Sequence, residues 1–340
     1  MDAIIDCVSV TGDYSGSVAV VGGGPAGMAA AYYLARLGAK VTIYEKRERL
    51  GGVVSAIIPN FRIDDSVIAK DAALLEKLGV KVLYNTEAPA VDVLKKEYDS
   101  VILAVGAYKR GELKLEGGEA QNALAFLEDY NRTNGKMAIG KNVVVIGGGN
   151  TAMDTARAAK RCDGVEHVYL VYRRTKRYMP AAEDELLEVL EEGVEFKELL
   201  SPVSLENGKL LCKKMELGSM DASGRAGVTE TGETEEVLAD TVIVAVGEKV
   251  PTEFYEANGI AVNERGKARI NDKTMETSAE GVYVVGDGAR GAATIVEAIR
   301  DAQVAAKAIL GHDIVKGQPV PGTEKDCYSK KAILKESKDA

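Results

Sequence analysis

The sequence predicts an α/β protein made of two doubly wound parallel sheets, with the second domain inserted into the first. Two observations lead to this prediction. A unit of strand, glycine-rich turn, helix and strand begins at Ser17, and a unit of the same form begins at Asn142. In addition, the sequence of residues 99–106 is similar to that of residues 240–247. A repeat on this scale indicates two related domains rather than a solenoid.

The first unit opens with Ser17–Val21, a short apolar run rich in β-branched residues, as in a buried strand. Residues 22–27 read Gly-Gly-Gly-Pro-Ala-Gly, and residues 28–37 are strong helix formers with apolar positions at helical spacing. Gly38 ends the helix, and residues 40–45 form the next strand. This order predicts two parallel strands joined by a helix.

The second unit repeats the pattern 125 residues later. A strand is predicted at 142–146, a glycine turn at 147–152, a helix at 153–162 and a strand at 168–172.

The last strand is predicted at 281–285, and a helix follows from about Thr294 to Leu310. We interpret this strand and helix as the chain returning to complete the first domain. The predicted boundaries are therefore 1–110 and 250–340 for the first domain and 111–249 for the second. The lysine-rich tail 311–340 is predicted to be partly disordered.

Composition excludes several classes of protein. The net charge is −9, and no long basic run occurs, which argues against nucleic acid or an anionic membrane as a partner. No apolar run reaches the roughly 18 residues of a membrane span, and residues 1–16 lack the features of a signal peptide, so we expect a cytoplasmic protein. The four cysteines show no C-x-x-C spacing, so disulfide reduction is not expected. Because the sequence also has only two histidines, no metal site is expected.

The first glycine turn carries the pattern Gly22-x-Gly24-x-x-Gly27 between a strand and a helix. In dinucleotide-binding (Rossmann-like) domains these glycines allow the tight turn, the close approach of a pyrophosphate and the packing of helix on strand. Glu45 closes the second strand, where a carboxylate accepts hydrogen bonds from ribose hydroxyls and repels a 2′-phosphate. The site therefore suits FAD or NAD rather than NADP.

The second glycine turn, 147–152, ends in Ala152, and its second strand is followed by Arg173 and Arg174 instead of an acid. Arginines at this position bind a 2′-phosphate through charge-assisted hydrogen bonds, which favours NADPH over NADH. Lys176–Arg177 add basic charge nearby. The alternative is that Arg173 and Arg174 are solvated surface charges.

A third element is Gly286-Asp287 after the late strand. In flavoproteins an aspartate here typically binds the ribityl chain, and a helix starting near Thr294 would direct its N-terminus at the flavin N1–C2=O edge. The alternative is that Asp287 is a simple turn or N-cap residue.

Together these motifs resemble the glutamate synthase small-subunit family of FAD/NAD(P)H oxidoreductases. The nearest likeness is to the flavoprotein core of the selenate reductase subunits in that family. The stretches that carry the resemblance are 18–27, 51–62, 147–154, 171–175 with Met179-Pro180, and 285–291.

The resemblance implies two sets of cofactor-binding residues. Those expected for FAD are Gly22, Gly24, Pro25, Ala26, Gly27, Glu45, Lys46, Gly52, Val53, Ile58, Pro59, Phe61, Gly106, Gly286, Asp287, Thr294 and Ile295. Those expected for the nicotinamide dinucleotide are Gly147, Gly149, Asn150, Thr151, Arg173, Arg174 and Gly247. Lys46 is expected beside the adenosine, and Ile58 to Phe61 near the flavin.

The expected function is transfer of hydride from NADPH, or NADH, to FAD. Members of this family commonly carry iron–sulfur segments, and this sequence has none, so an iron–sulfur protein or domain is the expected electron partner. No catalytic side chain is predicted, because positioning of the two cofactors is sufficient for hydride transfer. The alternatives are an FAD-binding electron-transfer module or scaffold without independent turnover, and a flavin monooxygenase, for which no marker occurs.

Overall fold

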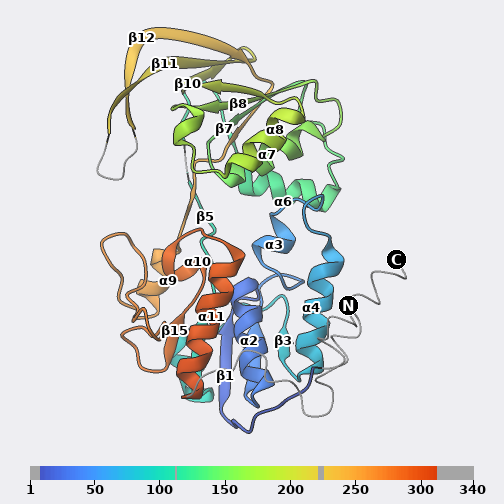
Figure 1. Cartoon of the computed structure of the whole chain (residues 1–340), viewed down its shortest axis with the longest axis vertical. Coiled ribbons are helices and arrows are strands. Elements are labelled where there is room, and N and C mark those ends of the chain that lie inside the picture. Colours follow the sequence, from blue (N-terminus) through green and yellow to red (C-terminus); the bar gives the residue numbers. More distant parts are fainter. Residues whose placement is uncertain (1–7, 112, 221–225, 312–340) are drawn as a thin grey trace. The chain divides into compact units, whose positions relative to one another are not determined.

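The structure is a computed structural model that describes residues 8–111, 113–220 and 226–311 (Figure 1). These residues form two compact units. Unit 1 comprises the chain up to Ser55, Asp64–Tyr108 and the chain from Val250 onward; unit 2 comprises Ala56–Ile63 and Lys109–Lys249. The predicted tail beyond Gly311 lies outside the described residues, as do Cys7 and Cys327.

Unit 1 contains a five-stranded sheet in which every neighbouring pair is parallel. Its strands, in sheet order, are β15 (Val282–Val284), β4 (Ser100–Leu103), β1 (Ser17–Val21), β2 (Lys40–Tyr44) and β3 (Lys81–Leu83). β15 comes from the late part of the chain and pairs with β4, so the chain returns to the first sheet at this point.

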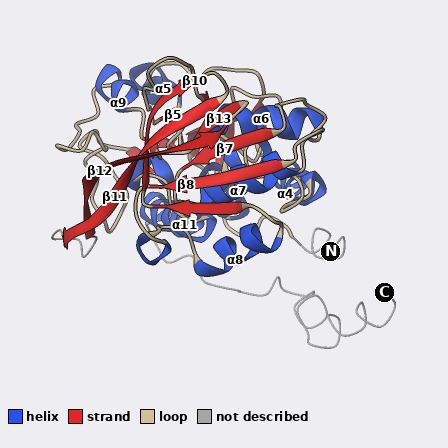
Figure 2. Ribbon diagram, turned by 90° about the horizontal axis from the view of Figure 1, so that it is seen from above, coloured by secondary structure: helices blue, strands red, loops and turns tan. Residues whose placement is uncertain are grey.

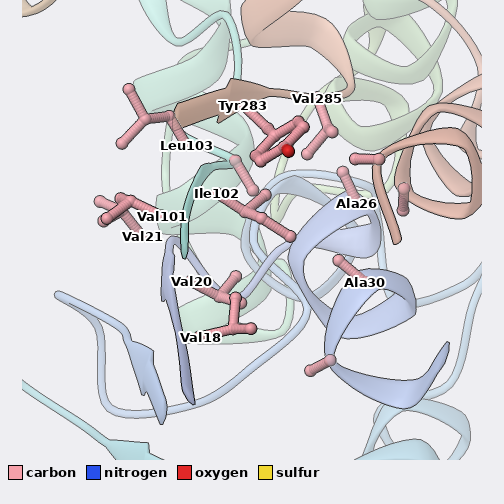
Figure 3. Packing of buried hydrophobic residues seen from close by; sticks show 14 of the residues in the cluster. Val18, Val20, Val21, Ala26, Ala30, Val101, Ile102, Leu103, Tyr283 and Val285 are labelled. Carbon is pink, nitrogen blue, oxygen red and sulfur yellow. The ribbon is translucent and has the colours of Figure 1, made fainter. Parts of the chain in front are cut away.

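Helices pack on this sheet through small apolar residues. Val18, Val20 and Ile102 are completely buried, and Ala30 of α2 packs in the same cluster (Figure 3). α11 packs against α2, and its Ala302 is completely buried. The helices of unit 1 are α2 (Pro25–Arg36), α4 (Asp65–Lys77), α5 (Val91–Glu97), α9 (Thr252–Ala257), α10 (Asp287–Arg290) and α11 (Ile295–Leu310). A short helix, α3 (Val53–Ala56), ends at the boundary with unit 2.

Unit 2 contains a second five-stranded parallel sheet, with β7 and β8 side by side and α7 packed against them (Figure 2). Its strands, in sheet order, are β6 (Gln121–Asn122), β13 (Thr241–Val244), β7 (Asn142–Ile146), β8 (His167–Tyr172) and β9 (Glu195–Glu198). Its helices are α6 (Ala123–Thr133), α7 (Asn150–Lys160), α8 (Glu183–Glu191) and the 3-10 turn η1 (Lys176–Tyr178). The predicted α/β fold class with two parallel sheets is confirmed.

Two antiparallel elements of unit 2 were not predicted. β10 (Leu200–Glu206), β11 (Lys209–Met220) and β12 (Ala226–Leu238) form a three-stranded sheet. β5 (Lys109–Arg110) pairs with β14 (Glu248–Lys249) next to the points where the chain passes between the units. Lysine–glutamate pairs such as Lys213–Glu230 cross the exposed face of β11 and β12.

Candidate functional site

The two glycine turns lead into helices whose N-termini are open. In α2 and α7 the N-cap residue is a glycine, no side chain caps the helix, and the first turn contains no acid. Each of the other described helices longer than four residues has a side-chain cap, an acid in its first turn, or both. The free N–H groups and partial positive charge of α2 and α7 are therefore available to an anion.

The glycines of the first turn serve two different purposes. A Cβ at Gly22 would lie 2.5 Å from the Ala104 oxygen, and one at Gly27 would lie 1.9 Å from the Gly22 oxygen, so the fold itself requires both glycines. A Cβ at Gly24 would meet no protein atom closer than 3.8 Å. Packing thus leaves the backbone at Gly24 uncovered, and this is the cradle that a pyrophosphate requires.

Glu45 is the buried acid of the first site. It follows β2 and is 4 % exposed, and its two carboxylate oxygens accept hydrogen bonds from the backbone N–H groups of Gly23 at 2.7 Å and Arg47 at 2.8 Å. A carboxylate has about four acceptor positions, so acceptor positions remain for ribose hydroxyls. The turn, the open helix and Glu45 together fit the adenosine diphosphate part of FAD.

Other predicted residues of unit 1 gather at the same edge of the sheet, because the carboxyl ends of parallel strands share one edge. Gly52 approaches the glycine turn closely: a Cβ on it would lie 2.8 Å from the Gly24 Cα. The Lys46 ammonium lies 3.9 Å from the ring centre of Tyr108, two residues after Gly106. The specific contacts that these residues make with FAD stay predictions.

The start of α11 differs from those of α2 and α7. Thr294 and Glu297 form a capping box, and the backbone N–H of Ala293 donates to Asp287 at 3.2 Å. An acid therefore already lies at the N-terminus of α11, which offsets part of the helix charge. The predicted roles of Thr294 and Ile295 at the flavin edge remain predictions.

Unit 2 repeats the arrangement at its own sheet edge. A Cβ at Gly147 would lie 2.4 Å from the Ala245 oxygen, whereas one at Gly149 would meet no protein atom closer than 3.9 Å. The Asn150 side chain accepts a hydrogen bond from Ala182 N, and the Thr151 hydroxyl donates to Glu248 at 2.8 Å. The second open helix thus has the same uncovered glycine at its start.

The two arginines after β8 are not equivalent. Arg173 is exposed. Arg174 is half-buried, and its Nε donates to the backbone oxygen of Ala226 at 2.7 Å. Arg173 is therefore the more available of the two cations for a phosphate.

Comparison with known proteins decides the family. Residues 16–307 match the family described as pyridine nucleotide-disulphide oxidoreductase. The chain belongs to this family. Members of this family use FAD and NAD(P)H, in agreement with the two open glycine turns.

Relatives agree with this family, and a solved structure shows the same fold. The chain is 41 % identical over 305 residues to the oxidoreductase YgfK of Escherichia coli K12, covering 88 % of this chain and 29 % of YgfK. It is 35 % identical to the glutamate synthase [NADPH] small chain of Azospirillum brasilense, covering 89 % of this chain and 67 % of the relative. FprA of Mycobacterium tuberculosis, solved in complex with NADPH, has the same fold, with a TM-score of 0.73 at 21 % identity, covering 88 % of this chain and 84 % of that one.

The two cysteines that the structure describes are both free thiols. Among the described residues, Cys162 and Cys212 are both buried, and burial raises the pKa of each thiol to about 12. Thiols with such pKa values stay protonated at neutral pH and are poor nucleophiles. The described part of the chain also contains no group of His, Cys, Asp or Glu placed to hold a metal, and no helix suited to crossing a membrane.

The segment Ala56–Ile63 belongs to unit 2, although the predicted boundary placed it in the first domain. The Asn131 amide on α6 donates to the backbone oxygens of Ala56 and Ile58, and it accepts from Asn60 N at 3.0 Å. These bonds join residues more than 70 positions apart, so local sequence patterns give no sign of them. The described contacts of Ile58, Pro59 and Phe61 lie in unit 2, and their contact with flavin stays a prediction.

Two side chains of this segment bind helices of unit 2. The guanidinium carbon of Arg161 lies 4.1 Å from the centre of the Phe61 ring. Arg62 donates to Asp154 at 2.6 Å and also bonds Glu185. Burial raises the pKa of Asp154 even though Arg62 donates to it. No local sequence pattern marks Asn131, Asp154 or Glu185 as partners of this segment.

Proposed function

We propose that this chain is the NADPH-oxidising part of an electron-transfer system, with FAD held by unit 1 and NADPH by unit 2. Bound FAD would supply the chemistry, since a flavin takes a hydride from a pyridine nucleotide and passes electrons on singly or in pairs. The protein's own residues bind and orient the two cofactors. The observation that carries the proposal is the pair of open helices, α2 and α7, each preceded by an uncovered glycine.

The assignment of the two sites rests on the charge after the second strand of each unit. Buried Glu45 follows β2, and a carboxylate there disfavours a 2′-phosphate. Arg173 follows β8, and a guanidinium there favours one. The relative from Azospirillum brasilense, which carries NADPH in its name, supports the same choice. We therefore infer that FAD and NADPH are the natural pair, with NADH a weaker reductant.

The proposed acceptor is an iron–sulfur protein or domain. Within the described residues, Cys162 and Cys212 are buried, and burial raises the pKa of each thiol to about 12, which argues against these two cysteines as the next carrier. The resemblance to a family whose members commonly carry iron–sulfur segments supports a one-electron acceptor. The chain spans 29 % of the length of YgfK, so a second redox centre in a longer polypeptide is equally consistent with the proposal.

The acceptor is tested with the purified, FAD-loaded chain reduced anaerobically by one equivalent of NADPH. Oxidised bacterial ferredoxin is then added, and in a parallel sample the aromatic disulfide DTNB. We expect the flavin absorbance to return with ferredoxin much faster than with DTNB. Faster reoxidation by DTNB would contradict the iron–sulfur proposal and point to disulfide reduction.

A further inference from the structure

Glu248 brings a carboxylate to the start of α7. Its oxygen lies 2.8 Å from the Thr151 hydroxyl, and both residues are half-buried. The backbone around Glu248 is fixed, because β14 pairs with β5 and Gly111 N donates to the Gly247 oxygen at 2.9 Å. Since α7 has no acid of its own in the first turn, Glu248 supplies a negative charge that the helix otherwise lacks.

The two units differ at this position although their sheets match. In unit 1, Leu103 of β4 pairs with the last residue of β1; in unit 2, Val244 of β13 pairs with the last residue of β7. Four residues beyond each of these positions the chain carries Ala107 in unit 1 and Glu248 in unit 2. Ala107 is buried and uncharged. The acid is thus a feature of the second site.

We propose that Glu248 weakens the binding of the pyridine nucleotide to unit 2, so that the oxidised nucleotide leaves after each turnover. This inference rests on the proposed function. FAD can remain bound through many turnovers, whereas the pyridine nucleotide is consumed and must exchange. A negative charge at the anion-binding helix end lowers affinity for the pyrophosphate by like-charge repulsion.

The hydrogen bond of Thr151 gives a second reason why Glu248 weakens binding of the pyridine nucleotide. The Thr151 hydroxyl carries one hydrogen, which it gives to Glu248 in this structure, so it cannot at the same time be given to a phosphate oxygen. The dinucleotide must therefore break the Thr151–Glu248 hydrogen bond to use this donor. Neutralising Glu248 removes the repulsion and weakens the competing hydrogen bond, because bonds to ionised acceptors are the stronger ones.

The test is isothermal titration calorimetry, which measures the dissociation constant of NADP⁺ for the FAD-loaded full chain. NADP⁺ is used because it binds without turnover. Glu248→Gln keeps the shape of the side chain and removes its charge. Glu248→Ala also removes the oxygen that accepts the hydrogen bond from Thr151. Glu233→Gln, on the exposed face of β12, is the matched control for the change in net charge. We expect both Glu248 variants to bind NADP⁺ about fivefold more tightly than wild type, the factor expected for one charge pair at about 4 Å in water. FAD content, read from the flavin absorbance, should equal that of the control.

Two different failures are distinguishable. If the wild-type chain binds NADP⁺ and the Glu248 variants bind it equally or more weakly, the inference is wrong while the proposed function stands. If neither wild type nor variants bind NADP⁺ or NADPH, the proposed function is wrong and this inference with it.

Discussion

The Glu45 carboxylate accepts a hydrogen bond of 2.7 Å from the backbone N–H of Gly23, joining the end of β2 to the turn that precedes α2. Glu45 is 4 % exposed, and its other oxygen accepts from Arg47 N. A buried carboxylate on two backbone donors is held in one orientation. The carboxylate is therefore already oriented, as the proposed contact with a ribose requires.

Replacing this carboxylate should release FAD. In Glu45→Gln the side chain loses its charge and places an amide NH₂ where only acceptors fit. We expect the dissociation constant for FAD to rise by about tenfold or more, since hydrogen bonds to charged groups contribute about 1.5–3 kcal/mol. The measurement is recovery of flavin fluorescence on dilution. The neighbouring exposed Glu48→Gln should bind FAD as wild type does, and equal loss in both variants would count against Glu45.

The choice between NADPH and NADH should depend more on Arg173 than on Arg174, because the Arg174 side chain is partly engaged by Ala226. In Arg173→Ala we expect kcat/KM for NADPH to fall by more than about tenfold, while the value for NADH changes little. Steady-state kinetics with both nucleotides give the ratio. The exposed Lys136→Ala in the same unit is the charge control. A proportional loss for both nucleotides would remove the 2′-phosphate assignment.

The ion pairs of Arg62 should stabilise unit 2. Arg62→Ala leaves Asp154 without the cation that now bonds it. We expect a loss of about 2 kcal/mol in the free energy of unfolding, less than for a fully buried pair because the Arg62 side chain is 29 % exposed. Urea denaturation measures this loss. Arg49→Ala breaks the exposed pair with Asp65 and should cost much less. Equal effects would show that the Arg62 pairs are no stronger than a surface pair.

Acid should weaken both units through a pair of equivalent aspartates. Backbone N–H groups hold the pKa of Asp99 below its usual value through Ser17, and that of Asp240 through Asn142 and Lys141. A carboxylate whose pKa is lower in the folded than in the unfolded state stabilises the fold. This stabilisation is complete at pH values above the unfolded-state pKa of about 3.9, and it is lost as the pH falls through the folded-state pKa.

In Asp99→Asn and Asp240→Asn we therefore expect a lower melting temperature at pH 7 and a smaller further loss between about pH 4 and pH 2. Thermal melts across this range test the prediction. Asp92→Asn, at another exposed aspartate, should keep the wild-type pH dependence. A wild-type slope in the two variants would rule out these aspartates as the source.

Local patterns predicted much of the fold. β1 spans the predicted Ser17–Val21, and α11 begins directly after the predicted Thr294, because buried β-branched runs and capping residues are local signals. The sheet of β10, β11 and β12 was not predicted. Its strands are largely exposed and charged, so they lack the apolar runs that mark a buried strand.

Residues of the candidate site could be predicted where they follow a strand at a fixed interval. They could not be predicted where they are brought together only by the fold. The glycine turns, Glu45 and Arg173 stand at fixed intervals from a strand. The Thr151–Glu248 hydrogen bond joins residues 97 positions apart and depends on β13 lying beside β7. No local pattern reveals such a pair.

We propose that the chain binds FAD and reduces it with NADPH in preference to NADH. The most direct measurement is an anaerobic absorbance spectrum of the purified protein during titration with each nucleotide. We predict a yellow protein with bands near roughly 375 and 450 nm that NADPH bleaches faster than NADH does. A protein that stays colourless after FAD is added, or a flavin that neither nucleotide bleaches, would contradict it.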